Sequence, residues 1–122
     1  MKKVIRSFGY AFKGIGYAFK TQLNFRIHSV ATLIAAAMGF WLRISTAEWL
    51  WIILCIAIVL LTELLNTAIE TLTDLVSPQY NEKAGHVKDV SAAAVVVSAV
   101  FALIVGMMIF LPKLCLLFCH AA

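Results

Sequence analysis

One stretch of the sequence, TELLNTAIETLTDL, carries acidic and amide side chains where an apolar run continues. In a helix, at about 100° per residue, four of these side chains share one narrow face: Glu63, Asn66, Glu70 and Asp74. A carboxylate inside a membrane costs about 2.5–3.5 kcal/mol on insertion scales, so it is a functional hypothesis by default. Glu63, the deeper acid, suits a general base that accepts a proton from an alcohol. Glu70, closer to water, suits a ligand of a hard cation such as Mg²⁺.

A second polar group, Lys88 and Asp89, directly precedes the last apolar stretch. A lysine can meet a phosphate as a point charge, and the adjacent acid can orient the lysine or a metal ion. Phosphoryl transfer needs mostly positioning and neutralisation of charge by metal and cations. The sequence has no P-loop pattern, so a nucleotide site would have to be built from helices, and we expect neighbouring subunits to complete it.

Other interpretations of the acidic face stay open at this point. In a purely structural interpretation the acids pair with Lys83, Lys88 or Arg26 and stabilise a helix bundle. A small proton-coupled membrane transporter would also use one intramembrane acid, here Glu63, and would work without ATP. A non-enzymatic membrane subunit would bind no nucleotide.

The composition shows what kind of protein must position these groups. Of the 122 residues 63% are hydrophobic and 13% charged, against about 45–50% and 25% in soluble domains, and the mean hydropathy is +0.97. We therefore expect one all-α integral membrane domain over residues 1–122. The hydrophobic runs predict transmembrane helices over 23–42, 48–76 and 90–111, the last ending before Pro112.

The N-terminal residues 1–22 repeat GYAFK at 9–13 and 16–20, with apolar residues at a spacing of three to four. This pattern predicts an amphipathic helix on the membrane surface. Basic residues are concentrated before the first span, which favours a cytoplasmic N-terminus in the inner (cytoplasmic) membrane and argues against a nucleic-acid partner. Trp41, Trp49 and Trp51 would then form an aromatic belt at the outer side.

The segments ELLNTAIETLTDLVS, AGHVKDVSAAAV, SFGYAFKG and NFRIH together resemble the prokaryotic diacylglycerol kinase family, which includes undecaprenol kinases. The resemblance implies a homotrimer of three-span subunits with a surface helix and with active sites between subunits. It also implies Mg²⁺ with ATP as phosphoryl donor and a membrane lipid alcohol as acceptor. The segments NFRIH and LVSPQY look more like the undecaprenol kinase branch, which favours undecaprenol over diacylglycerol.

The resemblance also implies roles for single residues. Glu63 would be the catalytic base, supported by Asn66, and Glu70 would bind the metal. Gln22 stands where the family often has a glutamate that is a second metal ligand, so the charge at that position is lost. The implied ATP contacts are Lys3, Tyr10, Gln22, Glu70, Gln79, Tyr80, Asn81, Lys88 and Asp89.

Overall fold

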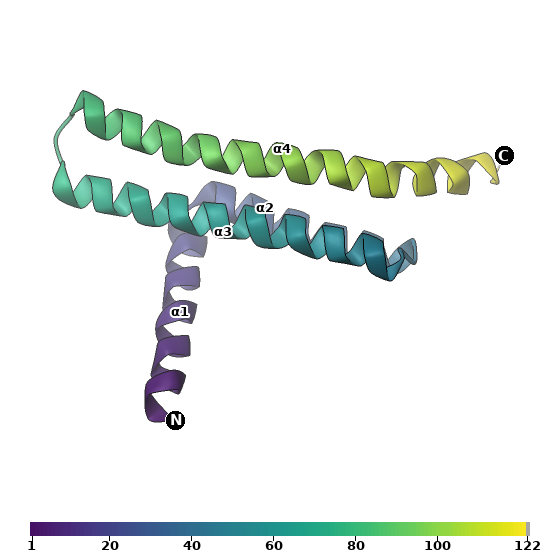
Figure 1. The fold of residues 1–122 in the computed structure, drawn as a ribbon, viewed down its shortest axis with the longest axis horizontal. Coiled ribbons are helices and arrows are strands. Elements are labelled where there is room, and N and C mark those ends of the chain that lie inside the picture. Colours follow the sequence, from purple (N-terminus) through teal and green to yellow (C-terminus); the bar gives the residue numbers. More distant parts are fainter. Residues whose placement is uncertain (122) are drawn as a thin grey trace.

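The computed structural model describes residues 1–121, and in this part of the chain the regular structure is entirely helical. The four helices are α1 (Lys2–Thr21), α2 (Leu23–Trp41), α3 (Thr46–Val76) and α4 (Glu82–Cys119). Helices α3 and α4 run antiparallel over most of their length, α2 lies alongside them, and α1 projects crosswise from the bundle (Figure 1). Three helices, α2, α3 and α4, are long and apolar enough to cross a membrane. The expected all-α fold is confirmed, with three helices that could span a membrane.

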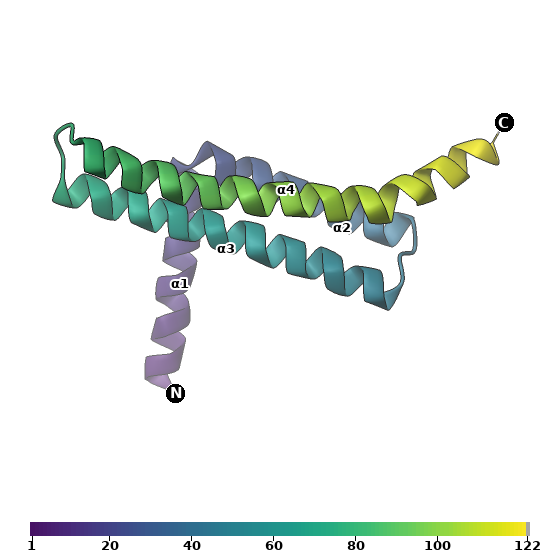
Figure 2. The ribbon, with the colours of Figure 1, turned by 45° about the horizontal axis from the view of Figure 1, so that its top comes forward.

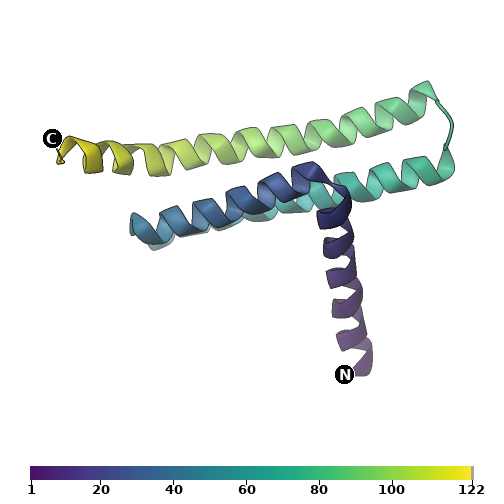
Figure 3. The same cartoon turned by 180° about the vertical axis from the view of Figure 1, so that it is seen from behind.

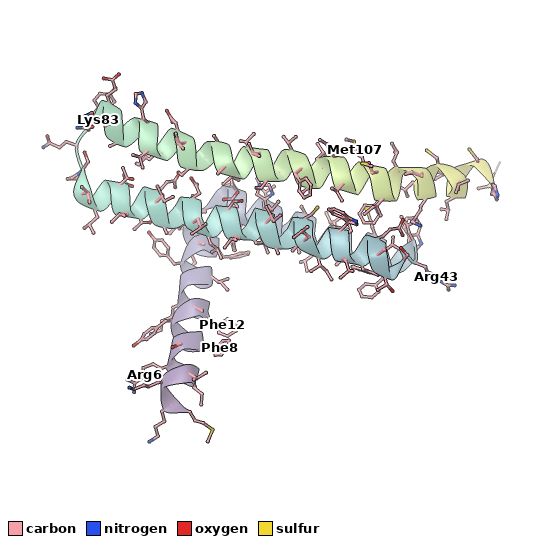
Figure 4. The ribbon with its side chains drawn as sticks, viewed as in Figure 1. Arg6, Phe8, Phe12, Arg43, Lys83 and Met107 are labelled. Carbon is pink, nitrogen blue, oxygen red and sulfur yellow. The ribbon has the colours of Figure 1, made fainter. Side chains whose placement is uncertain are left out.

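The change of direction between α1 and α2 occurs at a single residue. Gln22 closes α1 and opens α2, and its backbone is extended, with φ −111° and ψ 114°. One residue in the β region is enough to break the helical path and turn the chain. Ala18, in the last turn of α1, is buried, and α1 contacts both α2 and α3. Figure 4 shows Phe8 and Phe12 projecting from one side of α1 and Arg6 from another.

Helix α3 begins two residues earlier than the sequence predicted, because Ser45 caps it. The Ser45 hydroxyl accepts a hydrogen bond from the Glu48 backbone N–H at 3.2 Å, and the Glu48 carboxylate accepts one from the Ser45 N–H at 2.7 Å. This reciprocal capping box satisfies two backbone donors. Lys113 of α4 lies 3.2 Å from the same carboxylate and ties α4 to this end of α3.

The predicted bounds of the last helix were wrong at both ends. Instead of spanning 90–111, α4 begins at Glu82, where the Asn81 side chain accepts a hydrogen bond from the Ala84 N–H at 3.2 Å. This cap moves Lys88 and Asp89 from a presumed helix boundary onto the helix itself. At the other end Pro112 lies inside α4, which continues to Cys119. A proline removes one backbone hydrogen bond, and it bends a helix more often than it ends one in a membrane; α4 curves away from α3 towards its C-terminus (Figure 2).

Polar and small side chains hold α3 and α4 together in the middle of the bundle. The hydroxyls of Thr62 and Ser98 lie 2.8 Å apart, and Ser98 is buried. Hydrogen bonds between helices help where lipid supplies no hydrophobic drive to association. At the end of the bundle near the α2–α3 turn, an apolar cluster of Ile44, Ile52, Ile109 and Phe110 joins the helices. Seen from behind, α2 lies along α3, and α1 projects from the point where α1 and α2 meet (Figure 3).

The tryptophans do not all lie in one exposed belt. Trp41 and Trp51 are exposed, but Trp49 is half-buried and packs against Phe40, with 4.9 Å between the ring centroids. A Cβ added at Gly39 would lie 2.6 Å from Cη2 and 2.8 Å from Cζ2 of Trp49. Gly39 therefore serves to bring the indole of α3 against the backbone of α2.

Gly39→Ala is expected to destabilise the bundle by about 1–3 kcal/mol, because the added methyl overpacks the contact with Trp49. Thermal unfolding in detergent, followed by circular dichroism, measures the effect. Gly85→Ala is the matched control, since a Cβ there meets nothing within 4 Å and alanine favours the helix. Equal melting temperatures for the two variants would contradict the role given to Gly39.

Candidate active site

The centre of the candidate site is Glu63, which is buried on α3 with 1% of its surface exposed. Its nearest charged or titratable partner is His28 of α2, whose Nε2 lies 3.3 Å from Glu63 Oε1. Among residues 1–121, no group donates a hydrogen bond of good geometry to this oxygen. A buried polar atom without a hydrogen bond is costly and uncommon in native proteins, so it points to a functional demand at this position.

Asn66, one turn further along α3, connects α3 with α4. Its amide nitrogen donates to Glu70 Oε1 at 3.4 Å, and its amide oxygen accepts a hydrogen bond from the Ser91 hydroxyl at 2.6 Å. The Ser91 hydroxyl also lies 2.9 Å from the Lys88 carbonyl. Asn66 thus links Glu70 to α4 through Ser91, and its amide nitrogen and oxygen bond groups other than the Glu63 carboxylate.

Lys88 and Asp74 form an ion pair between α4 and α3 near the α3–α4 turn. Asp74 is largely exposed and Lys88 is partly exposed, so water screens the pair and it contributes little to stability. The structural interpretation, in which the acids pair with basic residues, therefore holds for Asp74. In the part of the chain that is described, neither Glu63 nor Glu70 has a lysine or arginine partner.

The remaining predicted ATP contacts are not gathered around Glu63 within one chain. Lys3 and Tyr10 lie on the exposed surface of α1, where the Lys13 ammonium is 5.8 Å from the centre of the Tyr10 ring. Gln22 is half-buried at the α1–α2 junction. The others are exposed at the α3–α4 turn or at the start of α4: Gln79, Tyr80, Asn81 and Asp89.

Two residues of the site were not singled out from the sequence, His28 and Ser91. Each contacts the acidic face from another helix, His28 from α2 and Ser91 from α4. Helical periodicity finds neighbours within one helix, but it does not pair residues across helices. The available signal was that His28 is, with Arg26, one of the two titratable residues in the first predicted membrane span.

Two cavities border the site. One, of about 400 Å³, lies among α2, α3 and α4 inside the apolar part of the bundle, and His28 is one of its lining residues. The other, of about 660 Å³, lies in the corner between α1 and α3 and is almost wholly apolar. The first cavity therefore reaches His28, the side chain that contacts Glu63.

The possible metal ligands in the described chain fit a metal ion that binds together with a nucleotide. Within residues 1–121, no three side chains of His, Cys, Asp or Glu come together as a metal site. Mg²⁺ commonly takes only one or two protein carboxylates and completes its shell with phosphates and water. The carboxylate of Glu70, held by Asn66, meets that requirement.

Comparison with known proteins agrees with this chemistry. The family described as prokaryotic diacylglycerol kinase matches residues 9–110. The chain is 40% identical over 114 residues to the undecaprenol kinase of Bacillus subtilis strain 168, covering 93% of each protein. It is 44% identical over 112 residues to the diacylglycerol kinase of Synechocystis, covering 88% of this chain and 62% of that protein. The diacylglycerol kinase of Escherichia coli K12 is 32% identical over 102 residues, covering 84% of each.

These matches extend over most of the chain and include the segment with Glu63, Asn66 and Glu70. They separate the kinase hypothesis from the transporter and from the non-enzymatic subunit, because the matched family and relatives are kinases. The three apolar helices agree with the same assignment and make the protein a multi-pass membrane protein. The chain belongs to the prokaryotic diacylglycerol kinase family, and it is a lipid kinase.

Proposed function

We propose that this kinase transfers the γ-phosphoryl group of ATP, bound with Mg²⁺, to the hydroxyl of undecaprenol in the cytoplasmic membrane. The observation that carries the proposal is the buried Glu63 carboxylate, which lies 3.3 Å from His28, a residue that lines an apolar cavity. A base in this position can meet the head group of a lipid whose chain stays in the membrane.

In the proposed reaction Glu63 takes the proton of the lipid hydroxyl, whose oxygen forms the new bond to the γ-phosphorus. The bond between that phosphorus and the β–γ bridging oxygen breaks, and ADP leaves. Glu70 would hold the metal together with the amide oxygen of Gln22, and the metal would neutralise phosphate charge. Lys88 would contact a phosphate once ATP competes with Asp74 for its ammonium group.

The proposal includes a homotrimer with a cytoplasmic N-terminus. Lys3 and Tyr10 lie on the exposed surface of α1, which projects crosswise from the bundle (Figure 1), and this supports a site completed by a neighbouring subunit. The crosswise position of α1 and its separate apolar and basic sides support its placement on the membrane surface (Figure 4). Lys83 and Arg43 mark opposite ends of the bundle, with more basic residues at the Lys83 end.

Undecaprenol is favoured over diacylglycerol because the undecaprenol kinase of Bacillus subtilis matches this chain almost end to end. The diacylglycerol kinases of Escherichia coli and Synechocystis also align with it, so the two acceptors must be compared directly. The decisive experiment offers undecaprenol and diacylglycerol separately to the purified protein in lipid vesicles with radiolabelled ATP and Mg²⁺. We expect labelled undecaprenyl phosphate to form faster. Faster phosphorylation of diacylglycerol would reject undecaprenol as the acceptor.

Gly106→Leu tests whether the lipid chain occupies the cavity among α2, α3 and α4. Gly106 lines this cavity, and a Cβ there meets nothing within 4 Å, so the larger side chain fits but takes up cavity space. Losing about 1–2 kcal/mol of apolar contact should raise the KM for the lipid about 5- to 30-fold and leave the KM for ATP unchanged. Met107→Leu is the control, because Met107 does not line the cavity and points away from α3 (Figure 4). An unchanged lipid KM for Gly106→Leu would place the chain elsewhere.

A further inference from the structure

We propose that His28 is a positioning residue that orients the Glu63 carboxylate for proton transfer from the lipid hydroxyl. The inference rests on the proposed role of Glu63 as the base and adds a residue from a different helix. Its starting point is the 3.3 Å separation between His28 Nε2 and Glu63 Oε1.

The neighbouring polar groups leave this task to His28. Asn66 uses its amide nitrogen on Glu70 and its amide oxygen on Ser91. Thr67 donates its hydroxyl to the backbone carbonyl of Glu63 at 2.9 Å, not to the carboxylate. Glu70, which lies on the same face of α3, repels the Glu63 carboxylate. Among residues 1–121, His28 is thus the side chain placed to stabilise a carboxylate at this position.

The chemistry requires such a partner. A buried carboxylate can rotate about its last side-chain bond, and a base that rotates freely spends little time in the reactive orientation. An imidazole N–H on one carboxylate oxygen fixes the plane of the group and leaves the second oxygen for the hydroxyl of the acceptor. Hydrogen bonds of this kind are often long without substrate and shorten in the reactive complex, which agrees with 3.3 Å and imperfect geometry.

The position of His28 also connects the base with the acceptor's cavity. His28 is one of the residues that line the cavity among α2, α3 and α4, and its ring contacts Glu63 at the same time. A lipid chain in this cavity would bring its hydroxyl towards the carboxylate past the imidazole. The same side chain would then align the base with the bound lipid.

Substitution of His28 separates this role from a structural one. We expect His28→Ala to lower kcat about 10- to 100-fold, the size of a lost hydrogen bond to a charged group, with the KM for ATP unchanged. His28→Gln should recover at least part of this loss, because its amide can still donate to the carboxylate. Ser29→Ala is the matched control, since Ser29 follows His28 on α2, does not line the cavity, and its hydroxyl bonds the Phe25 backbone carbonyl at 2.7 Å.

A double-mutant cycle with Glu63→Asp shows whether His28 acts through Glu63. The shorter carboxylate should lose the contact with His28, so adding His28→Ala to the Glu63→Asp variant should cost less than threefold. The same 10- to 100-fold loss in both backgrounds would overturn the inference. So would a His28→Ala enzyme as active as Ser29→Ala. If the wild-type protein phosphorylated no lipid alcohol, the proposed function itself would fail, and that result is distinct from both.

Discussion

Glu63→Gln is expected to lower kcat for lipid phosphorylation by about 100- to 10,000-fold, the usual contribution of a general base. Glutamine keeps the size and shape of the side chain but does not accept the proton of the lipid hydroxyl. ATP binding should be retained, because in the proposed site the nucleotide is held by Glu70, Lys88 and a neighbouring subunit. Initial rates with radiolabelled ATP in lipid vesicles, together with nucleotide binding measured separately, give both quantities.

Glu48→Gln is the matched control for this variant. It makes the same change on the same helix, but Glu48 caps the N-terminal end of α3 and contacts Lys113. We expect it to lower the melting temperature slightly and to leave turnover unchanged. Removing a buried charge should not unfold the Glu63→Gln protein, since an isosteric neutral group is less costly to bury. Normal turnover in Glu63→Gln would rule out Glu63 as the base.

The acidic face could be found from the sequence because all its members lie on one helix. A 100° period places Glu63, Asn66 and Glu70 together, and the structure joins Asn66 with Glu70 by a hydrogen bond. The three spans followed equally directly from long apolar runs, since lipid requires helices of a fixed minimum length. Both predictions depend on local pattern alone.

The parts that were missed depend on packing between helices or on local capping. His28 reaches Glu63 from α2, and Ser91 reaches Asn66 from α4, and both contacts require the helices to be docked. The early start of α4 follows from the Asn81 cap, which extends the helix through a polar segment where hydrophobicity gives no signal. Pro112 was interpreted as a stop, but the helix passes through it.

These contacts divide the acidic face into two parts with different partners. Glu63 is fully buried and is contacted from α2, whereas Glu70 is half-buried and is held through Asn66 by α4. Lipid must approach from the bilayer and ATP from water, so in the proposed site the acceptor would meet the Glu63 part and the nucleotide the Glu70 part. Mutations on the two parts should therefore separate acceptor chemistry from metal and nucleotide binding.

Glu70→Gln tests the second part. Because the neutral amide is a weaker Mg²⁺ ligand than a carboxylate, we expect the Mg²⁺ concentration for half-maximal activity and the KM for ATP to rise at least about tenfold. This rise should be large because Gln22, the other proposed ligand, brings no negative charge that could compensate. Initial rates over a Mg²⁺ series at fixed ATP measure it.

Glu82→Gln is the control for Glu70→Gln, because it neutralises an exposed acid at the start of α4 and should leave the Mg²⁺ dependence unchanged. The response to added Mg²⁺ also distinguishes Glu70→Gln from Glu63→Gln. If Glu63 is the base and Glu70 the metal ligand, raising Mg²⁺ should rescue Glu70→Gln in part and should not rescue Glu63→Gln. If Mg²⁺ rescued neither variant and Glu70→Gln kept the Mg²⁺ dependence of the wild type, Glu70 would contribute no charge to the metal. The metal would then be bound by other residues.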